Sequence, residues 1–208
     1  MLSSETGSRG EIEMDNLGEM FDRWGSDKAR NGYAGAYECL FRKGRNDIGA
    51  LLEVGIGTMI PGVHSSMVGY AGEGYRPGGS LRAWRDFFPH ATVYGMDVQP
   101  DTQFTDEERI VTLLGNSTDP SEVGQALQHA RHKTFDIIID DGSHYAADQL
   151  ATLKNLFPLV NPNGTYIVED LVGTQIFESI GTIGEICGGS PYFFVGSRNN
   201  PLVITKRE

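Results

Sequence analysis

Acidic side chains and a histidine follow two predicted strands of this sequence, at the points where the strands end. They are Asp140, Asp141 and His144 after a strand predicted over residues 135–139, and Glu169 and Asp170 after one over residues 165–168. Because parallel strands end at the same edge of a sheet, these side chains should converge on a small volume. Clustered carboxylates need a neutralising partner, and Mg²⁺ suits oxygen ligands better than Zn²⁺ does. Solvated strand-end acids, one of them capping a helix, are the alternative interpretation.

A glycine turn follows an earlier predicted strand over residues 50–54. Gly55 and Gly57 would let the backbone turn sharply and approach a ligand at the carboxyl edge of the sheet. Ile60 stands where a dinucleotide-binding motif has its third glycine, which counts against a bound pyrophosphate. A plain turn after a strand remains the alternative.

Polar residues that suit a nucleoside end the next two predicted strands, over residues 92–96 and 110–114. Asp97 could accept hydrogen bonds from both hydroxyls of a ribose. Asn116 and Ser117 could face an adenine edge, although capping of the helix that begins near residue 120 explains them equally well.

These positions belong to a pattern in which short apolar runs alternate with helical segments. Helices are expected over residues 80–88, 121–131, 146–157 and near 175–186. This alternation predicts an α/β fold with a parallel sheet covered on both faces. Segments 192–195 and 202–205 flank a turn at 198–201 and predict a closing antiparallel hairpin.

Two helices are expected before the sheet, over residues 15–24, with Asp15 as the N-cap, and over residues 33–43. Residues 1–14 are interpreted as a flexible leader and residues 15–208 as one domain. The glycine- and proline-containing stretch 58–79 is predicted to be an insertion that acts as a lid or substrate loop, with plain disorder as the alternative.

The composition of the sequence limits the kinds of partner that the protein is expected to bind. Lys and Arg number 17 against 28 Asp and Glu, and the net charge of −11 disfavours a nucleic-acid partner. The sequence has no apolar run of the roughly 20 residues that span a bilayer, so no membrane association is expected. Two distant cysteines, Cys39 and Cys187, form no disulfide framework, which suits a reducing cytoplasm.

Several of these segments recur together in one known family. The matching motifs are Gly25-Ser26-Asp27-Lys28, Glu53-Val54-Gly55, residues 79–89, Gly95-Met96-Asp97, Asp140-Asp141-Gly142-Ser143-His144 and Val168-Glu169-Asp170. The sequence resembles class I S-adenosylmethionine-dependent methyltransferases. More narrowly, it resembles the metal-dependent sugar O-methyltransferases of the mycinamicin 2''-O-methyltransferase type. The resemblance covers most of residues 24–172.

This resemblance implies a Rossmann-like, mostly parallel seven-stranded sheet and transfer of a methyl group to a sugar hydroxyl of a glycoside or oligosaccharide. One candidate reaction is 1-O-methylation of a 3-O-methylated mannoside. The implied metal ligands are Asp141, Glu169 and Asp170, and the implied general base is His144. The implied cofactor-binding residues are Glu53, Gly55, Gly57, Ser80, Asp97, Asn116, Ser117 and Asp140. A homodimer is also expected.

Two other functions would fit part of the same pattern. A nicotinamide-dependent oxidoreductase would use the glycine turn and Asp97, but it gives no reason for the acids and the histidine at the far strand ends. A non-catalytic protein could keep the fold only to bind a partner, and the intact acids argue against it.

Overall fold

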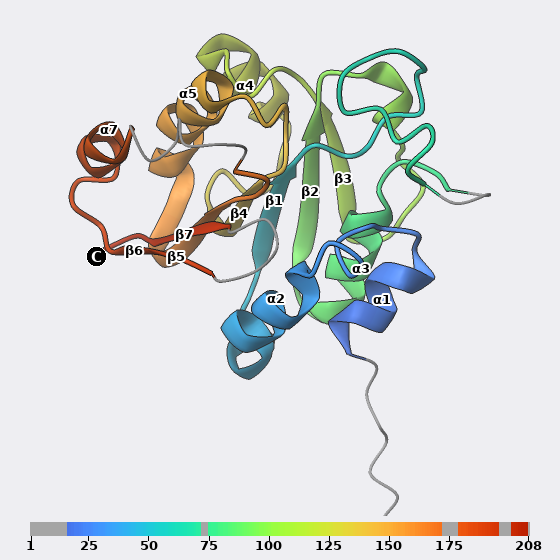
Figure 1. Cartoon of the computed structure of the whole chain (residues 1–208), viewed down its shortest axis with the longest axis horizontal. Coiled ribbons are helices and arrows are strands. Elements are labelled where there is room, and N and C mark those ends of the chain that lie inside the picture. Colours follow the sequence, from blue (N-terminus) through green and yellow to red (C-terminus); the bar gives the residue numbers. More distant parts are fainter. Residues whose placement is uncertain (1–15, 72–74, 172–178, 196–200, 208) are drawn as a thin grey trace, which may run out of the picture.

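The computed structural model describes residues 16–71, 75–171, 179–195 and 201–207 (Figure 1). A seven-stranded sheet forms its centre, with the strand order β3-β2-β1-β4-β5-β7-β6. The predicted leader, Asp15 and most of the predicted hairpin turn lie outside the described residues.

Five strands are parallel and two are antiparallel, as the sequence predicts. The parallel strands are β1 (Ala50–Val54), β2 (Thr92–Asp97), β3 (Ile110–Leu114), β4 (Phe135–Asp140) and β5 (Val160–Val168), and the antiparallel strands are β6 (Tyr192–Phe194) and β7 (Leu202–Thr205). β5 begins at Val160 rather than at residue 165, because Val160 pairs with Phe135 across a register shift. The turn-like residues between Val160 and residue 165 hid this extension.

The described helices begin close to their predicted positions. They are α1 (Leu17–Arg23), α2 (Tyr33–Phe41), α3 (Gly79–Phe87), α4 (Pro120–Leu127), α5 (Ala146–Leu156) and α7 (Ile180–Ile186), with short 3₁₀ turns at Arg42–Gly44, Pro100–Thr102 and Phe157–Leu159. Helix α4 ends at Leu127 rather than at residue 131. Residues 175–178 of the last predicted helix lie outside the described residues. The predicted cap of α1 was wrong. Asn16 caps this helix in a reciprocal pair with Glu19, whose backbone N–H lies 3.0 Å from Asn16 Oδ1. No described helix is long and apolar enough to cross a bilayer.

The helices cover the sheet in two layers (Figure 1). Helices α1, α2 and α3 pack on one face. There the Trp84 ring packs edge to face against the rings of Phe21 and Tyr37, with 4.9 and 5.0 Å between the ring centroids. Helices α4, α5 and α7 pack on the other face. Alternate residues of β1 therefore enter opposite cores, Leu51 in the first and Leu52 in the second.

Two strand-end loops cross closely at the carboxyl edge of the sheet. Gly55 follows β1 with φ +90°, and a Cβ atom there would lie 2.0 Å from the carbonyl oxygen of Asp141, which follows β4. Only glycine permits both this backbone conformation and this close approach. The chain then runs from Gly55 to α3 without a helix or strand in its described residues. The role of residues 58–79 as a lid or substrate loop stays a prediction.

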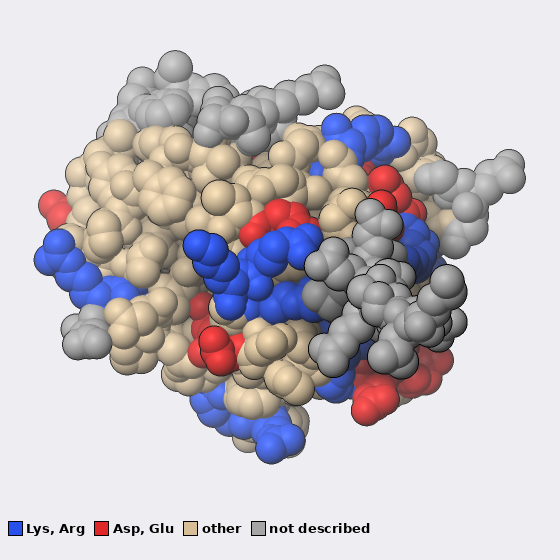
Figure 2. Space-filling view, turned by 90° about the horizontal axis from the view of Figure 1, so that it is seen from below, with Lys and Arg blue, Asp and Glu red and all other residues tan. Residues whose placement is uncertain are grey.

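Charged side chains do not form one continuous basic surface on the face that Figure 2 shows. Lys and Arg side chains of the described residues lie there in separate groups with acidic side chains between them (Figure 2).

Candidate active site

Two pockets open at the carboxyl edge of the sheet. The larger has a volume of about 680 Å³, and its lining includes Lys28, Tyr33, Asp141, His144 and Asp170. The smaller has a volume of about 310 Å³, and its lining includes Asn116, Ser117 and Asp140. Both pockets are lined by Gly55, His64, Ser65 and Asp97. The two cavities therefore adjoin at the glycine turn.

The acids predicted after β4 and β5 lie side by side. The backbone N–H of Glu169 donates to the carbonyl of Asp140 at 2.9 Å, so the two strand ends stay in register beyond the sheet. Asp141, His144 and Asp170 each place one potential ligand atom within 4.8 Å of the others. Two carboxylates and an imidazole are donor types that divalent cations accept. This group contains Asp141 and Asp170 of the predicted ligands, and it contains His144 in place of Glu169.

Lys28 lies among three of the acids. Its ammonium is 2.6 Å from Asp141 Oδ2, 2.6 Å from Glu169 Oε2 and 3.1 Å from Glu53 Oε1. The Lys28 side chain is 3% exposed. Burial opposes its charge, but the surrounding carboxylates outweigh that effect and raise the pKa of Lys28 above its ordinary value.

Lys28 also affects the acids around it. Burial disfavours an ionised Asp141, yet Lys28 and His144 outweigh burial and lower the pKa of Asp141 to about 2. Burial raises the pKa of Glu53 and of Glu169. A further positive charge in the adjoining pocket would favour the ionised forms of these carboxyl groups.

Sequence reasoning assigned no role to Lys28. The residue belongs to the Gly25–Lys28 motif, but its partners lie 113 and 141 residues away along the chain. A local pattern contains no signal for contacts at such separations.

Two tyrosines of α2 contact the acids that follow β5. The sequence predicted a helix over residues 33–43 but assigned neither tyrosine a role at the site. The Tyr33 hydroxyl donates to Asp170 Oδ1 at 2.9 Å and accepts from the Asp170 backbone N–H at 3.0 Å. The Tyr37 hydroxyl donates to Glu169 Oε1. Their four-residue spacing, one helical turn, was the available signal for a shared face.

His144 lies at the side of this cluster. Its Nε2 is 3.1 Å from Asp141 Oδ1 and 3.6 Å from Asp170 Oδ2. Burial lowers the pKa of His144, but the hydrogen bond to Asp141 and the nearby negative charges raise it more, so the pKa is above the ordinary imidazole value.

Three of the five non-glycine residues with positive φ among the described residues line the larger pocket, and the other two, Arg109 and Asn163, do not. Ser65, His144 and Asp170 line it and have φ values of 60°, 62° and 46°, a region that residues other than glycine rarely adopt. Strain of this kind gathers at functional sites, where the surrounding structure maintains it.

Asp97 supports the glycine turn. Its Oδ2 accepts the Ile56 backbone N–H at 2.8 Å and its Oδ1 accepts the Gln99 backbone N–H at 2.9 Å. Burial raises the pKa of Asp97. The carboxylate lines both pockets, so it can hold the turn and also face a ligand.

Asn116 and Ser117, which follow β3, line the smaller pocket, and neither residue is the N-cap of α4. That cap is Asp119, which accepts the Ser121 backbone N–H at 2.8 Å. Asn116 Oδ1 accepts the Thr118 backbone N–H, and the Ser117 hydroxyl shares a hydrogen bond of 2.8 Å with Thr152.

Asp140 is buried beside the smaller pocket. Its Oδ2 has no hydrogen-bond partner among the described residues, and burial raises its pKa to about 7. Glu53 and Ser80 bond to each other, with the Ser80 hydroxyl donating to Glu53 Oε2 at 2.7 Å. Ser80 lines the larger pocket, whereas Glu53 lies beneath Lys28 and lines neither cavity.

Three curated proteins that are similar to this chain are all O-methyltransferases. The chain is 37% identical over 149 residues to a demethylmacrocin O-methyltransferase of Streptomyces fradiae, an alignment that covers 72% of this chain and 33% of the relative. It is 38% identical over 135 residues to the mycinamicin VI 2''-O-methyltransferase of Micromonospora griseorubida, covering 65% of this chain and 30% of the relative. No protein-family model matches the sequence.

Two further comparisons agree with these. A rhamnosyl tetracenomycin-C 3'-O-methyltransferase of Streptomyces olivaceus is 37% identical over 160 residues, covering 75% of this chain and 37% of the relative. A structure of the MycE methyltransferase in complex with Mg, SAH and mycinamycin VI superimposes with a TM-score of 0.71 at 27% identity, covering 94% of this chain and 56% of that chain. The chain therefore spans only about a third of the length of these curated relatives.

The fold is that of the class I methyltransferases, with a mostly parallel seven-stranded sheet and C-terminal antiparallel strands, as predicted. Within that class, the relatives of this chain are sugar O-methyltransferases, which confirms the resemblance that the motifs indicated.

Proposed function

We propose that the protein transfers the methyl group of S-adenosylmethionine to a hydroxyl of a sugar in a glycoside or oligosaccharide, with Mg²⁺ as the metal. The observation that carries this proposal is the grouping of Asp141, His144 and Asp170 within 4.8 Å, in a pocket that adjoins a second one across the glycine turn. A known reaction of this type, 1-O-methylation of a 3-O-methylated mannoside, is the first candidate.

The cofactor would lie across the glycine turn, where α/β folds bind nucleotides. Asp97 would hold the ribose hydroxyls, and Asn116, Ser117 and Asp140 would surround the adenine in the smaller pocket. The Gly55–Gly57 turn gives the backbone close access to the ligand. Ser80 lines the larger pocket directly, whereas Glu53 would act through Ser80 and Lys28.

The side chains at the pocket fit a hard divalent cation. Asp141 and Asp170 face the larger pocket, and the Glu53, Asp141, Glu169 and Asp170 carboxyl groups outnumber the Lys28 ammonium among them. Glu169, the third proposed ligand, is in contact with Lys28 and Tyr37, so it would bind the cation with a remaining lone pair. When bound, Mg²⁺ would make a sugar hydroxyl more acidic.

His144 would accept the proton of that hydroxyl. The hydroxyl oxygen attacks the methyl carbon of the sulfonium, the carbon–sulfur bond breaks, S-adenosylhomocysteine leaves and the proton passes to the imidazole. The ring nitrogen Nε2 faces Asp141 and Asp170, and Asp141 stabilises the imidazolium that forms.

The acceptor would enter through the mouth of the larger pocket. Arg30 Nη2 donates to the carbonyl of Tyr70 at 3.2 Å, which joins the segment after α1 to the segment after β1. The Tyr70 side chain is 69% exposed and lines the pocket, so its ring offers an apolar surface to the face of a sugar. We assign the 58–79 segment to the acceptor as a lid or substrate loop.

The remaining assignments concern the whole protein. We propose a cytoplasmic homodimer, and the free thiols of Cys39 and Cys187 support a reducing compartment.

The test is methyl transfer to defined acceptors. Incubation with S-adenosylmethionine that carries a deuterated methyl group, followed by mass spectrometry, should label glycosides with vicinal hydroxyls, including a 3-O-methylated mannoside. A matched panel of phenols and carboxylic acids should stay unlabelled. Labelling of that panel and of no glycoside would overturn the proposal.

A further inference from the structure

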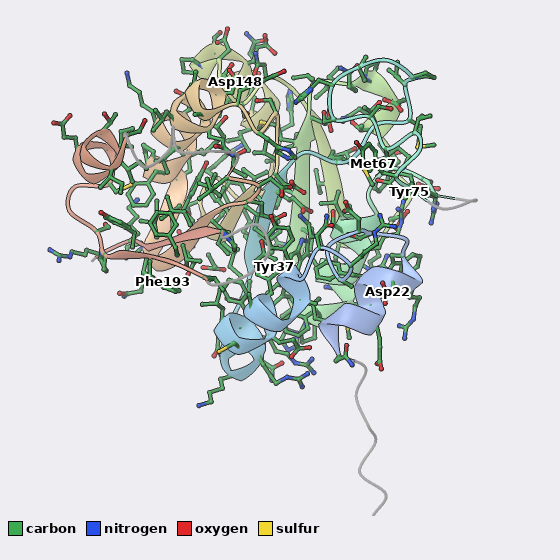
Figure 3. The ribbon with its side chains drawn as sticks, viewed as in Figure 1. Asp22, Tyr37, Met67, Tyr75, Asp148 and Phe193 are labelled. Carbon is green, nitrogen blue, oxygen red and sulfur yellow. The ribbon has the colours of Figure 1, made fainter. Side chains whose placement is uncertain are left out.

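Helix α2 contacts both acids that follow β5 through one face. Tyr33 and Tyr37 lie four residues apart, and their hydroxyls reach Asp170 and Glu169 respectively. Figure 3 labels Tyr37 on the side of α2 that faces the sheet. Both rings are 1% exposed and belong to the core between α2 and the sheet. Their positions are therefore fixed by packing and do not depend on the acids alone.

The two tyrosines hold their acids differently. Glu169 has a second partner, because Lys28 contacts its other oxygen at 2.6 Å. The Tyr33 hydroxyl instead makes two hydrogen bonds to one residue: it accepts the Asp170 backbone N–H at 3.0 Å and donates to Asp170 Oδ1 at 2.9 Å. One oxygen atom thus ties the main chain and the side chain of Asp170 together.

This double contact acts on a strained residue. Asp170 has φ +46°, a conformation that is unfavourable for aspartate without support from its surroundings. With Oδ1 bound to Tyr33, Oδ2 is turned towards the pocket, 3.6 Å from His144 Nε2. The Tyr33 hydroxyl therefore contributes to the direction of the Asp170 carboxylate.

We propose that Tyr33 is a positioning residue that holds Asp170 in the orientation required to bind a divalent cation. This inference rests on the proposed function, because it needs the cation site at Asp141 and Asp170. Groups that orient metal ligands in this way commonly change metal affinity by roughly 10- to 100-fold when they are removed.

The experiment compares Tyr33→Phe with Tyr94→Phe. Tyr94 is a matched control, because its buried hydroxyl also pairs with both the ring and the backbone N–H of one residue, His132, away from the pockets. Each variant keeps its ring and loses one hydroxyl. Mn²⁺ titration by calorimetry, with S-adenosylhomocysteine bound, measures metal affinity. Thermal unfolding of the metal-free proteins measures any general loss of stability.

Tyr33→Phe should weaken Mn²⁺ binding by roughly 10- to 100-fold. Tyr94→Phe should bind Mn²⁺ as the unmodified protein does, and the two variants should show similar small losses in Tm. Equal metal affinity in both variants, or tighter binding by Tyr33→Phe, would overturn the inference. If the unmodified protein binds no Mn²⁺ at all, the proposed metal site fails instead. Electron paramagnetic resonance of the bound Mn²⁺ gives a second readout, since the Tyr33→Phe spectrum should differ from the other two.

Discussion

Lys28 supplies the charge that allows the partly buried Asp141 and the buried Glu169 and Glu53 to lie close together. Its ammonium lies within 3.1 Å of all three, and it is itself almost fully buried. A buried ion pair adds little stability over an apolar pair, but removal of one partner leaves the other charges without compensation.

Lys28→Met should therefore destabilise the fold by about 3–5 kcal/mol, the usual cost of breaking a buried charge pair. Methionine keeps most of the side-chain volume, so the loss reports the charge. Urea unfolding of the metal-free protein measures it, with Lys43→Met at an exposed position as the control. A loss no larger than that of the control would show that Lys28 does not neutralise these acids.

His144 is the residue proposed to accept the proton of the sugar hydroxyl. We expect His144→Ala to lower turnover by roughly 10² to 10⁴, the usual contribution of a general base. Affinity for S-adenosylhomocysteine should stay nearly unchanged, since His144 is not among the residues proposed to bind the cofactor. Single-turnover kinetics with saturating cofactor and metal provide the measurement, and His129→Ala, at an exposed position, is the control. Near-normal turnover would assign the proton transfer to another group.

The positions of the acids could be predicted from the sequence and their partners could not. Asp141 and Asp170 directly follow apolar strand-like runs, and parallel strands deliver their ends to one edge. Tyr33 and Lys28 reach those acids from a distant part of the chain, and residue types alone do not show such contacts.

At the scale of elements, the turn after β1 depends on the residue that ends β2. Asp97 accepts the Ile56 backbone N–H at 2.8 Å, so the conformation of the glycine turn and the proposed ribose contact share one carboxylate. A substitution there removes both the acceptor of the ligand and a support of its binding loop.

We expect Asp97→Ala to weaken binding of S-adenosylhomocysteine by about 1.5–3 kcal/mol, the usual worth of a hydrogen bond to a charged group. Isothermal calorimetry measures the change. Asp119→Ala is a suitable control, since it also removes an acid that accepts backbone N–H groups, at the start of α4. Unchanged affinity in Asp97→Ala would contradict the placement of the ribose.

The strands were predictable because each buried run is apolar and bounded by turn residues. Helix ends were less so. α4 was expected to reach residue 131, but it ends at Leu127. Lys133 donates to the carbonyl of Gln128, the C-cap residue, at 2.8 Å, and the periodic pattern of apolar residues contains no signal for this local contact at the helix end. The segment from Gly55 to α3 has no periodic pattern, so nothing in the sequence indicated that His64 and Ser65 would line both pockets.

At the scale of the whole molecule, the site is assembled from two parts of the chain. The five parallel strands supply the glycine turn and the acids, and the segment before β1 supplies Lys28, Tyr33 and Tyr37. Residues of α1 and α2 pack in the same hydrophobic core as residues of α3, so these helices share that face of the sheet. The composition predicted one domain but gave no indication that its first helices complete the site.

The most direct test of the proposed function is the metal dependence of methyl transfer to a sugar acceptor. Metal-free protein in excess EDTA should transfer no methyl group above background, and addition of Mg²⁺ beyond the chelator should restore the rate. The reason is that a cation held by Asp141 and Asp170 would promote loss of the hydroxyl proton. Binding of S-adenosylhomocysteine, measured in the same EDTA buffer, separates loss of the metal from loss of the cofactor. Full transfer in EDTA would contradict metal-dependent methyl transfer at this site.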